Sequence, residues 1–149
     1  MPLHGAGVTG TLLGVRIAVG SDEETPLAAA VIRHLQQAGH AVEVVALTDP
    51  WPAVGRGVGE RVASGQADAG VVCCWTGTGV CIAANKVRGV RAALCADAGT
   101  AEGARRWNDA NVVALSNRAT SEPVAAEILD AFLSTAPDPE ELQLIAGIE

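Results

Sequence analysis

Short apolar runs rich in β-branched residues alternate with longer Ala-rich segments along most of the chain. The runs are typical of β-strands, whereas apolar residues at helical spacing, such as Leu27, Val31 and Leu35, predict amphipathic helices. One run has no polar interruption, as expected of a strand buried on both faces of a parallel sheet. The predicted strands are 16–20, 41–47, 69–74, 90–95 and 112–115, and the predicted helices are 24–38, 54–64, 80–86, 100–107, 122–133 and 139–148.

Strands that alternate with helices predict the α/β class, here a Rossmann-like three-layer αβα sandwich around a five-stranded parallel sheet with right-handed crossovers. Segment 49–52, Asp-Pro-Trp-Pro, is predicted to be a turn because it contains two prolines. Residues 15–149 are expected to form a single domain. Residues 1–14 are small and Gly-rich, lack the pattern of a secretion signal, and are expected to form a disordered leader.

Composition narrows the range of partners. Ten basic and seventeen acidic side chains give a net charge of −7, which disfavours nucleic acid and anionic membranes. Three Trp, one Phe and no Tyr provide little for base stacking, and no apolar run is long enough to span a bilayer. The four cysteines form no Cys-x-x-Cys pair, so we expect reduced thiols in a cytoplasmic protein.

Ligands of open parallel sheets bind beyond the carboxyl ends of the strands, where segment 74–79, Cys-Trp-Thr-Gly-Thr-Gly, is the most informative. A thiol at Cys74, just before a helix N-terminus, would have a stabilised thiolate. Gly77 and Gly79 would let backbone amides approach an anionic ligand closely. In the alternative interpretation, Cys74 is a small buried apolar residue and the glycines only form the turn.

Several strings resemble the ribose-5-phosphate isomerase B / galactose-6-phosphate isomerase family. They are 74–86, 89–95 and 108–112, supported by 20–22 and 63–65, and the resemblance extends from about residue 16 to 133. It implies an aldose–ketose isomerase that acts on a sugar or sugar phosphate through a cis-enediolate, without a metal or cofactor. It also implies a homodimer or homotetramer with the active site at the subunit interface.

The resemblance assigns roles to individual residues. Cys74 matches the thiolate that abstracts the proton, and Thr76 matches a hydroxyl that assists it. A base paired with preorganised donors suits the removal of a weakly acidic proton next to a carbonyl. The matching substrate-binding positions are Asp22 and Asn108, which contact sugar hydroxyls, and Gly77, Thr78 and Gly79, whose amides stabilise the enediolate.

Three departures from the family affect specificity. Glu23 replaces a His that helps to hold phosphate, and Trp107 replaces a His credited with opening the sugar ring. Segment 137–149 contains no arginine, although the family uses arginines there to clamp the phosphate. Because Glu23 would repel a dianion, we expect poor ribose-5-phosphate isomerase activity and a substrate that is unphosphorylated, amino-modified or otherwise altered. Loss of the ring-opening His should slow a substrate that is mainly cyclic, unless Glu23 or Asp97 takes over that role.

The tryptophans and the basic residues leave alternatives open. Trp75 stands where the family has a small residue, so it either narrows or stacks in the pocket or packs against a partner subunit. Trp107 would wall the site, and Trp51 would either line it or pack. Arg118 is the best candidate for an anion contact. Solvated charge is expected for Arg88, Arg91, Arg105 and Arg106, and surface positions are expected for His4, His34 and His40.

A second function class is a non-catalytic sugar-binding or structural subunit of an isomerase complex. Such a subunit would not need Cys74, Thr76 and Asp22, all of which this chain retains. The sequence therefore favours the enzyme.

Overall fold

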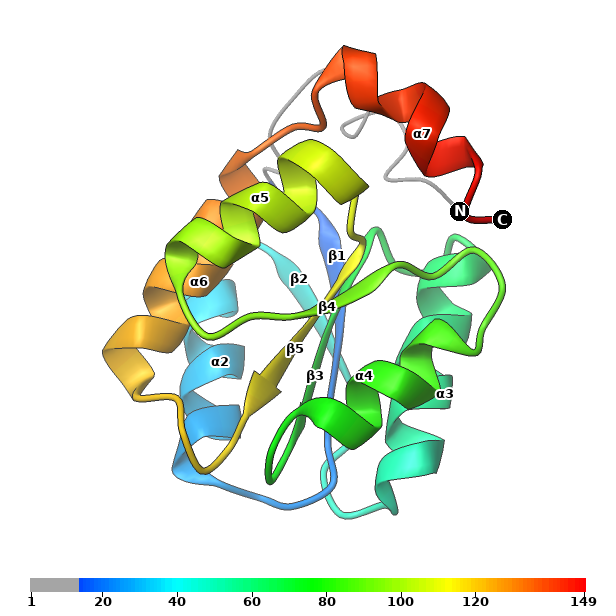
Figure 1. Cartoon of the computed structure of the whole chain (residues 1–149). Coiled ribbons are helices and arrows are strands. Elements are labelled where there is room, and N and C mark those ends of the chain that lie inside the picture. The colour runs from blue at the N-terminus through cyan, green and yellow to red at the C-terminus, as the bar shows by residue number, and fades with distance from the viewer. Residues whose placement is uncertain (1–13) are drawn as a thin grey trace.

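The computed structural model describes residues 14–149 and contains one parallel sheet of five strands in the order β2-β1-β3-β5-β4 (Figure 1). The predicted α/β class and all-parallel sheet are confirmed. Except for Gly14, the predicted leader lies outside the described residues. The strands are β1 (Arg16–Ser21), β2 (Ala41–Ala46), β3 (Ala69–Cys74), β4 (Ala92–Leu94) and β5 (Val112–Ser116).

Helices cover both faces of the sheet and form the expected three layers (Figure 1). On one face α2 (Pro26–Gln37), α5 (Ala98–Asn108) and α6 (Glu122–Ser134) bury a core that includes Phe132. On the other face, α3 (Trp51–Ala63) and α4 (Thr78–Asn85) pack closely together. Within residues 14–149, no helix is long and apolar enough to cross a membrane.

The middle strand, β3, positions the candidate base. All six of its residues are buried, and it pairs with β1 on one edge and β5 on the other. It ends at Cys74, at the edge of the sheet where the strands have their carboxyl ends, the lower edge in Figure 1. Because β3 is held on both faces and both edges, the place of Cys74 is set by the core.

The turn predicted for 49–52 extends too far along the chain, because only its first two residues lie outside a helix. Helix α3 begins at Trp51, and Pro52 lies in its first turn, where a proline costs no hydrogen bond because the first amides of a helix have no partner within it. The helix also tolerates its glycines for a packing reason. A Cβ on Gly55 would lie 2.6 Å from the Cβ of Ala83, so glycine permits the close approach of α3 and α4.

Most of the other predicted boundaries lie within two residues of the observed ones, but two elements differ in extent or type. Strand β4 is shorter than the predicted 90–95, although the backbones of the flanking Arg91 and Cys95 still bond to residues 111–114. The single helix predicted for 139–148 is instead a 3₁₀ turn, Pro139–Glu141, followed by the short helix α7 (Leu142–Ala146).

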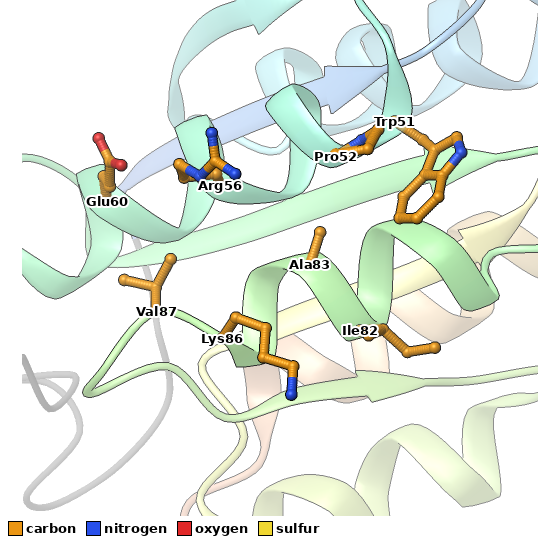
Figure 2. A pocket seen from close by; sticks show the side chains of 8 residues that line it. All are labelled: Trp51, Pro52, Arg56, Glu60, Ile82, Ala83, Lys86 and Val87. Atoms are coloured by element: carbon orange, nitrogen blue, oxygen red, sulfur yellow. The ribbon is translucent and has the colours of Figure 1, made fainter.

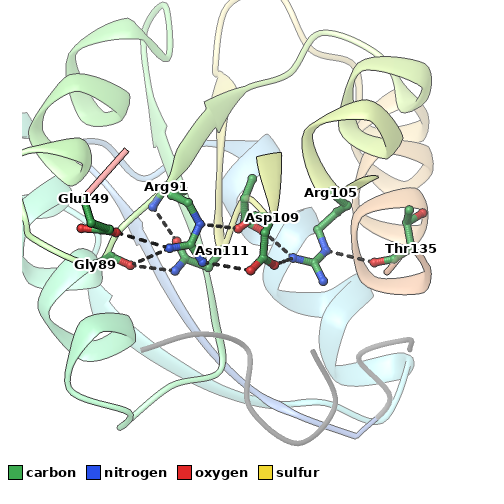
Figure 3. Close-up of polar contacts among 8 residues, drawn as sticks. Gly89, Arg91, Arg105, Asp109, Asn111, Thr135 and Glu149 are labelled. Atoms are coloured by element: carbon green, nitrogen blue, oxygen red, sulfur yellow. Dashed lines mark hydrogen bonds and ion pairs between the residues drawn. The ribbon is translucent and has the colours of Figure 1, made fainter. Parts of the chain in front are cut away.

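Charged residues form a network at the amino ends of the strands (Figure 3). Asp109 accepts hydrogen bonds from Arg105 at 2.9 Å and from Arg91 at 3.3 Å. Arg105 also donates to the carbonyl of Thr135 and is fully buried, and Arg91 is largely buried. The expectation of solvated charge is therefore wrong for both arginines. In the fold they donate to backbone carbonyls and pair with two carboxylates, those of Asp109 and Glu149.

The histidine expectations also need correction. His40 is buried and its Nδ1 accepts a hydrogen bond from the backbone N–H of Val15 at 3.3 Å. Burial, followed by the charge of His34, lowers the pKa of His40. His34 itself is partly exposed and lies 2.7 Å from Asp130, whereas His4 is outside the described residues.

Candidate active site

A pocket of about 300 Å³ opens at the carboxyl ends of the strands. Its lining comes from the end of β3, from the segments that follow β1 and β3, and from the first turns of α3 and α4. Most of its lining comes from segment 74–79, as the spacing at a strand end predicts. The residues that line it are Asp22, Trp51, Cys74, Trp75, Thr76, Thr78 and Gly79.

Cys74 is the cysteine among these lining residues. Its side chain is largely buried, and its carbonyl accepts a hydrogen bond from the backbone N–H of Asn117 at 2.8 Å. The remaining thiols are poor nucleophiles or bases: burial raises the pKa of Cys73 and of Cys95 to about 12, and burial also raises the pKa of Cys81. Of the four cysteines, Cys74 is therefore the candidate for a reactive thiol in this pocket.

The turn after Cys74 requires a glycine at position 77. Gly77 has a φ of +80°, and a Cβ there would lie 2.6 Å from Leu94 and 3.0 Å from the backbone of Leu115. Gly77 is also the residue that precedes α4. The turn thus brings the unpaired first-turn amides of α4 next to the pocket, where they favour negative charge.

Two hydroxyls lie together on this turn. The Oγ1 atoms of Thr76 and Thr78 are 2.7 Å apart, and both side chains are exposed to the pocket. Either hydroxyl can be the donor of this bond, so the pair can pass a proton to or from a ligand oxygen.

Asp22 carries an oxygen that the fold leaves unsatisfied. Its Oδ1 is buried and has no hydrogen-bond partner among the described residues, although the side chain lines the pocket. A buried acceptor without a donor costs about 1–3 kcal/mol. A ligand hydroxyl that entered the pocket could supply the missing donor.

Asn117 holds the loops of this edge together and was not singled out by the sequence analysis. Its side chain donates to Ser21 Oγ at 3.3 Å and accepts from Thr25 Oγ1 at 3.1 Å. With its backbone bond to Cys74, it joins the ends of β1, β3 and β5. The sequence could have indicated Asn117, because it is a polar residue just after a predicted strand and directly before Arg118.

Trp75 and Arg118 form a pair beside Cys74. The carbonyl of Trp75 accepts hydrogen bonds from Ser116 Oγ at 2.9 Å and from the Arg118 N–H at 3.1 Å. The guanidinium of Arg118 lies 6.0 Å from the centre of the indole, within the range of a cation–π contact. Arg118 itself lines an adjacent cavity of about 270 Å³, to which Thr76 also contributes.

Trp51 lines the pocket and also a larger groove of about 430 Å³ between α3 and α4, where Arg56 and Lys86 lie (Figure 2). Its ring packs on Gly79, where a Cβ would lie 2.9 Å from the indole. The sequence left open whether Trp51 lines the pocket or packs. In the structure the same side chain does both, since it packs on Gly79 and lines the pocket of Cys74.

Three predicted substrate-binding residues lie apart from this pocket within one chain. Trp107 and Asn108 are at the end of α5 and line a different cavity of about 480 Å³. Helix α5 starts at the carboxyl end of β4 and runs back along the sheet, which carries its last residues away from Cys74. Glu23 is exposed and is not among the residues that line the pocket.

Asp97 is a weak candidate for ring opening. It is the residue before α5, and its Oδ1 accepts a hydrogen bond from the backbone N–H of Thr100 at 2.7 Å. Hydrogen bonds from Thr100 lower the pKa of Asp97, which keeps the carboxyl ionised at neutral pH. Within residues 14–149, no group of three or more His, Cys, Asp or Glu side chains is placed to hold a metal ion.

Comparison with known proteins identifies relatives over most of the chain. Residues 17–144 match the profile of the family described as Ribose/Galactose Isomerase. The galactose-6-phosphate isomerase subunit LacB of Clostridium acetobutylicum is 38% identical over 140 residues, which cover 89% of this chain and 81% of the relative. The D-erythrulose-4-phosphate isomerase of Pectobacterium atrosepticum is 37% identical over 124 residues, or 78% of this chain and 81% of the relative.

Solved structures agree with the sequence comparison. The ribose 5-phosphate isomerase of Thermotoga maritima superposes with a TM-score of 0.84 at 35% identity, covering 90% of this chain and 97% of that one. The type B ribose 5-phosphate isomerase of Trypanosoma brucei gives a TM-score of 0.81 at 37% identity, covering 89% of this chain and 95% of that one.

Proposed function

The chain belongs to the ribose/galactose isomerase family, and we propose that it interconverts an aldose phosphate and a ketose phosphate through a cis-enediolate, with Cys74 as the base. One observation carries this proposal: the thiol of Cys74 and the unsatisfied Oδ1 of Asp22 line the same pocket. The pocket therefore combines a group that can remove a proton with an acceptor that awaits a sugar hydroxyl.

The reaction divides into two proton transfers at carbon. The Cys74 thiolate removes the proton from C2 of the open-chain aldose, and the electron pair moves onto the carbonyl oxygen to give the enediolate. Amides of the first turn of α4, from Gly77 to Gly79, stabilise that oxyanion. The Thr76–Thr78 hydroxyl pair moves a proton between O2 and O1. The Cys74 thiol then returns its proton to C1, which yields the ketose and restores the thiolate.

A phosphorylated substrate is supported by two observations. The relatives described above carry names that refer to phosphates of sugars with four, five or six carbons. Arg118 provides a cation next to the pocket. The expected repulsion of a dianion by Glu23 is weakened, because an exposed carboxylate outside the pocket is screened by water. We retain the expectation that specificity differs from that for ribose 5-phosphate.

The active site requires a second copy of the chain in this proposal. Trp107 and Asn108 are exposed and lie away from Cys74 within one chain. Trp75 is exposed at the rim of the pocket as well. A homodimer or homotetramer in which one copy presents Asn108 to the Cys74 pocket of another would bring together all the sugar-contacting residues that the family resemblance assigns.

Mixing two inactive variants tests this assembly. Cys74→Ser and Asn108→Ala homo-oligomers are each expected to lose most activity. If the two variants are refolded together and pair at random, about half of the dimers are mixed, and each mixed dimer has one intact site. The mixture should therefore regain up to about a quarter of the wild-type activity. Light scattering would give the oligomeric state. A monomer, or a mixture that stays inactive, would contradict a shared site while leaving the chemistry at Cys74 open.

Deuterium incorporation from D₂O tests the reaction itself. Wild-type protein is incubated with aldose and ketose phosphates of four to six carbons, and with the free sugars, and exchange at C1 and C2 is followed by NMR. We expect exchange that falls about 100- to 10,000-fold in Cys74→Ser, because the variant lacks an effective base. If the folded wild type exchanges no sugar at all, the proposal is wrong and a non-catalytic subunit becomes the better interpretation.

A further inference from the structure

Asn117 lines none of the pockets described above, yet it is bonded to both segments that carry the proposed chemistry. Its backbone N–H donates to the carbonyl of Cys74, and its side chain donates to Ser21, the residue before Asp22. We propose that Asn117 is a positioning residue whose side chain, acting through Ser21, holds the Asp22 carboxylate in place for a sugar hydroxyl. This inference rests on the proposed isomerase function and deepens it.

The side-chain amide of Asn117 has a defined orientation. Its Oδ1 accepts a hydrogen bond from Thr25 Oγ1 at 3.1 Å, and its Nδ2 donates to Ser21 Oγ at 3.3 Å. The Thr25 oxygen also accepts from the backbone N–H of Ala28, which leaves its own hydrogen for Asn117. In the reversed orientation, the Asn117 oxygen would face a Ser21 hydroxyl whose hydrogen is already donated to Glu23.

Ser21 transmits this restraint to Asp22. Its Oγ donates to the carbonyl of Glu23 at 2.7 Å and accepts from the Glu23 N–H at 3.4 Å, which closes a turn around Asp22. The N–H of Asp22 donates to the carbonyl of Cys73 at 3.3 Å. Ser21 is fully buried, so water does not compete for these bonds. The backbone on both sides of Asp22 is therefore held, and the amide of Asn117 joins this turn to the end of β5.

The relative placement of Asp22 and Cys74 decides whether one substrate can use both. The two side chains line the same pocket, so a sugar that donates a hydroxyl to Asp22 must at the same time present a C–H bond to Cys74. The Oδ1 atom of Asp22 has no donor within residues 14–149 to orient it, and its direction depends on the turn that Ser21 closes. A misplacement of about 1 Å can lower a rate by about 100-fold.

Substitution can separate the two links that Asn117 makes. The bond to the carbonyl of Cys74, at 2.8 Å, uses the backbone N–H and does not depend on the side chain. The bond to Ser21 uses only the side-chain amide. Asn117→Ala is therefore expected to loosen the turn around Asp22 while the segment of Cys74 stays tied to the end of β5.

A double-mutant cycle between Asn117→Ala and Asp22→Asn tests the inference. We would measure kcat/KM with ribose 5-phosphate, erythrulose 4-phosphate and galactose 6-phosphate, and use the best of the three for every variant. Asn117→Ala should lower kcat/KM by about tenfold in the wild type but by less than about twofold in Asp22→Asn. The second loss is smaller because the position of residue 22 matters little once its charge is gone.

Alkylation of Cys74 gives a second readout that does not need a substrate. Iodoacetamide labelling is followed by mass spectrometry of the peptide that contains Cys74. In Asn117→Ala the rate should stay within about twofold of the wild-type rate, since Cys74 is largely buried and keeps its backbone bond. An amide that only stabilised this edge of the sheet would, when removed, expose the thiol and speed its labelling.

Asn85→Ala is the matched control. The side-chain amide of Asn85 also joins two segments, since it donates to the carbonyl of Ala92 at 2.9 Å and accepts from its N–H at 2.7 Å, but it does not line the pocket of Cys74. Its effect on kcat/KM should be the same with and without Asp22→Asn. If Asn117→Ala fails to fold, Ser21→Ala cuts the same link at its other end and should show the same dependence on Asp22.

The outcomes distinguish two failures. Equal losses from Asn117→Ala in the wild type and in Asp22→Asn, or a much faster alkylation of Cys74, overturn this inference alone. A folded wild type that converts none of the sugar phosphates overturns the isomerase function and, with it, the inference that rests on that function.

Discussion

The two ends of the sheet handle polar side chains in opposite ways. At the amino ends, Arg91, Arg105 and Asp109 bond to one another and to backbone carbonyls (Figure 3). At the carboxyl ends, Asp22 keeps a buried oxygen without a partner among the described residues, and Trp75 remains exposed. The first end thus pairs its charged groups within the chain, although one buried guanidinium nitrogen of Arg105 has no partner among the described residues, whereas the second leaves an acceptor and an indole at a pocket.

This difference separates polar residues that serve the fold from those available to a ligand. A buried charge stabilises a protein only when its partners are in place, and removing one partner is costly. Conversely, an unsatisfied acceptor in a cavity indicates that the protein tolerates a cost in the empty state. We call the amino ends of the strands the closed end of the sheet and the carboxyl ends the open end. Substitutions at the closed end should therefore change the free energy of unfolding, and those at the open end should change activity.

The largest effect is expected at the closed end. Arg105→Met keeps most of the side-chain volume but removes the bonds to Asp109, Ala110 and Thr135. Because the side chain is fully buried, we expect a loss of about 3–5 kcal/mol in the free energy of unfolding. Urea denaturation measures it. Arg33→Ala, which breaks an exposed pair with Glu122, should change it by less than about 0.5 kcal/mol. Similar losses in both variants would contradict the comparison.

The open end should respond in the opposite sense. Asp22→Asn removes the charge that we propose binds a sugar hydroxyl, so kcat/KM should fall by about 10- to 100-fold, as expected for a hydrogen bond to a charged group. The free energy of unfolding should stay within about 0.5 kcal/mol, since Oδ1 has no hydrogen-bond partner to lose within residues 14–149. Steady-state kinetics and urea denaturation on the same preparation give both quantities. A destabilised variant with unchanged kcat/KM would place Asp22 with the structural residues.

The smallest expected effect is a pH dependence of the free energy of unfolding that comes from His40, which lies just before β2 at the closed end. Because burial and the charge of His34 lower the pKa of His40 in the folded protein, the folded state favours the neutral ring. The unfolded state takes up the proton first as the pH falls below about 6.5. The stability that His40 contributes is therefore present above that pH and is lost as the pH falls through the lowered folded value.

His40→Gln checks this pH dependence. The glutamine retains an acceptor for the N–H of Val15 but does not titrate. The free energy of unfolding of the wild type should fall relative to that of the variant between about pH 7 and 5, as followed by denaturation at several pH values. Parallel curves for the two proteins would show that His40 does not titrate differently in the folded state.

Local pattern was sufficient for the fold because each strand and helix has its own periodicity. The fully apolar run of β3 predicts a central strand and a carboxyl end at Cys74, both of which the structure contains. The start of α3 was missed because prolines were interpreted as breakers, although the first turn of a helix tolerates them. The strand order was beyond local pattern, since pairing depends on contacts between distant segments.

Part of the site was equally beyond local pattern. The loops after β1 and β3 could be placed at one edge by the parallel-sheet rule, and Asp22, Cys74 and Thr76 do share a pocket. The burial of Arg105 and His40 was missed because charged and polar types are usually exposed, and only tertiary packing reveals their partners. Likewise, Asn108 stands in a family motif, but the motif does not say which copy of the chain it serves.

The placement of the tryptophans has an optical consequence. The chain has three Trp and no Tyr, and Trp51, Trp75 and Trp107 are each about half exposed and line a cavity or its rim. The interior contains no indole among the described residues, with Phe132 as its aromatic ring. Tryptophan fluorescence from this protein will therefore report on ligands and neighbouring copies at those surfaces, and it will be insensitive to the packing of the core.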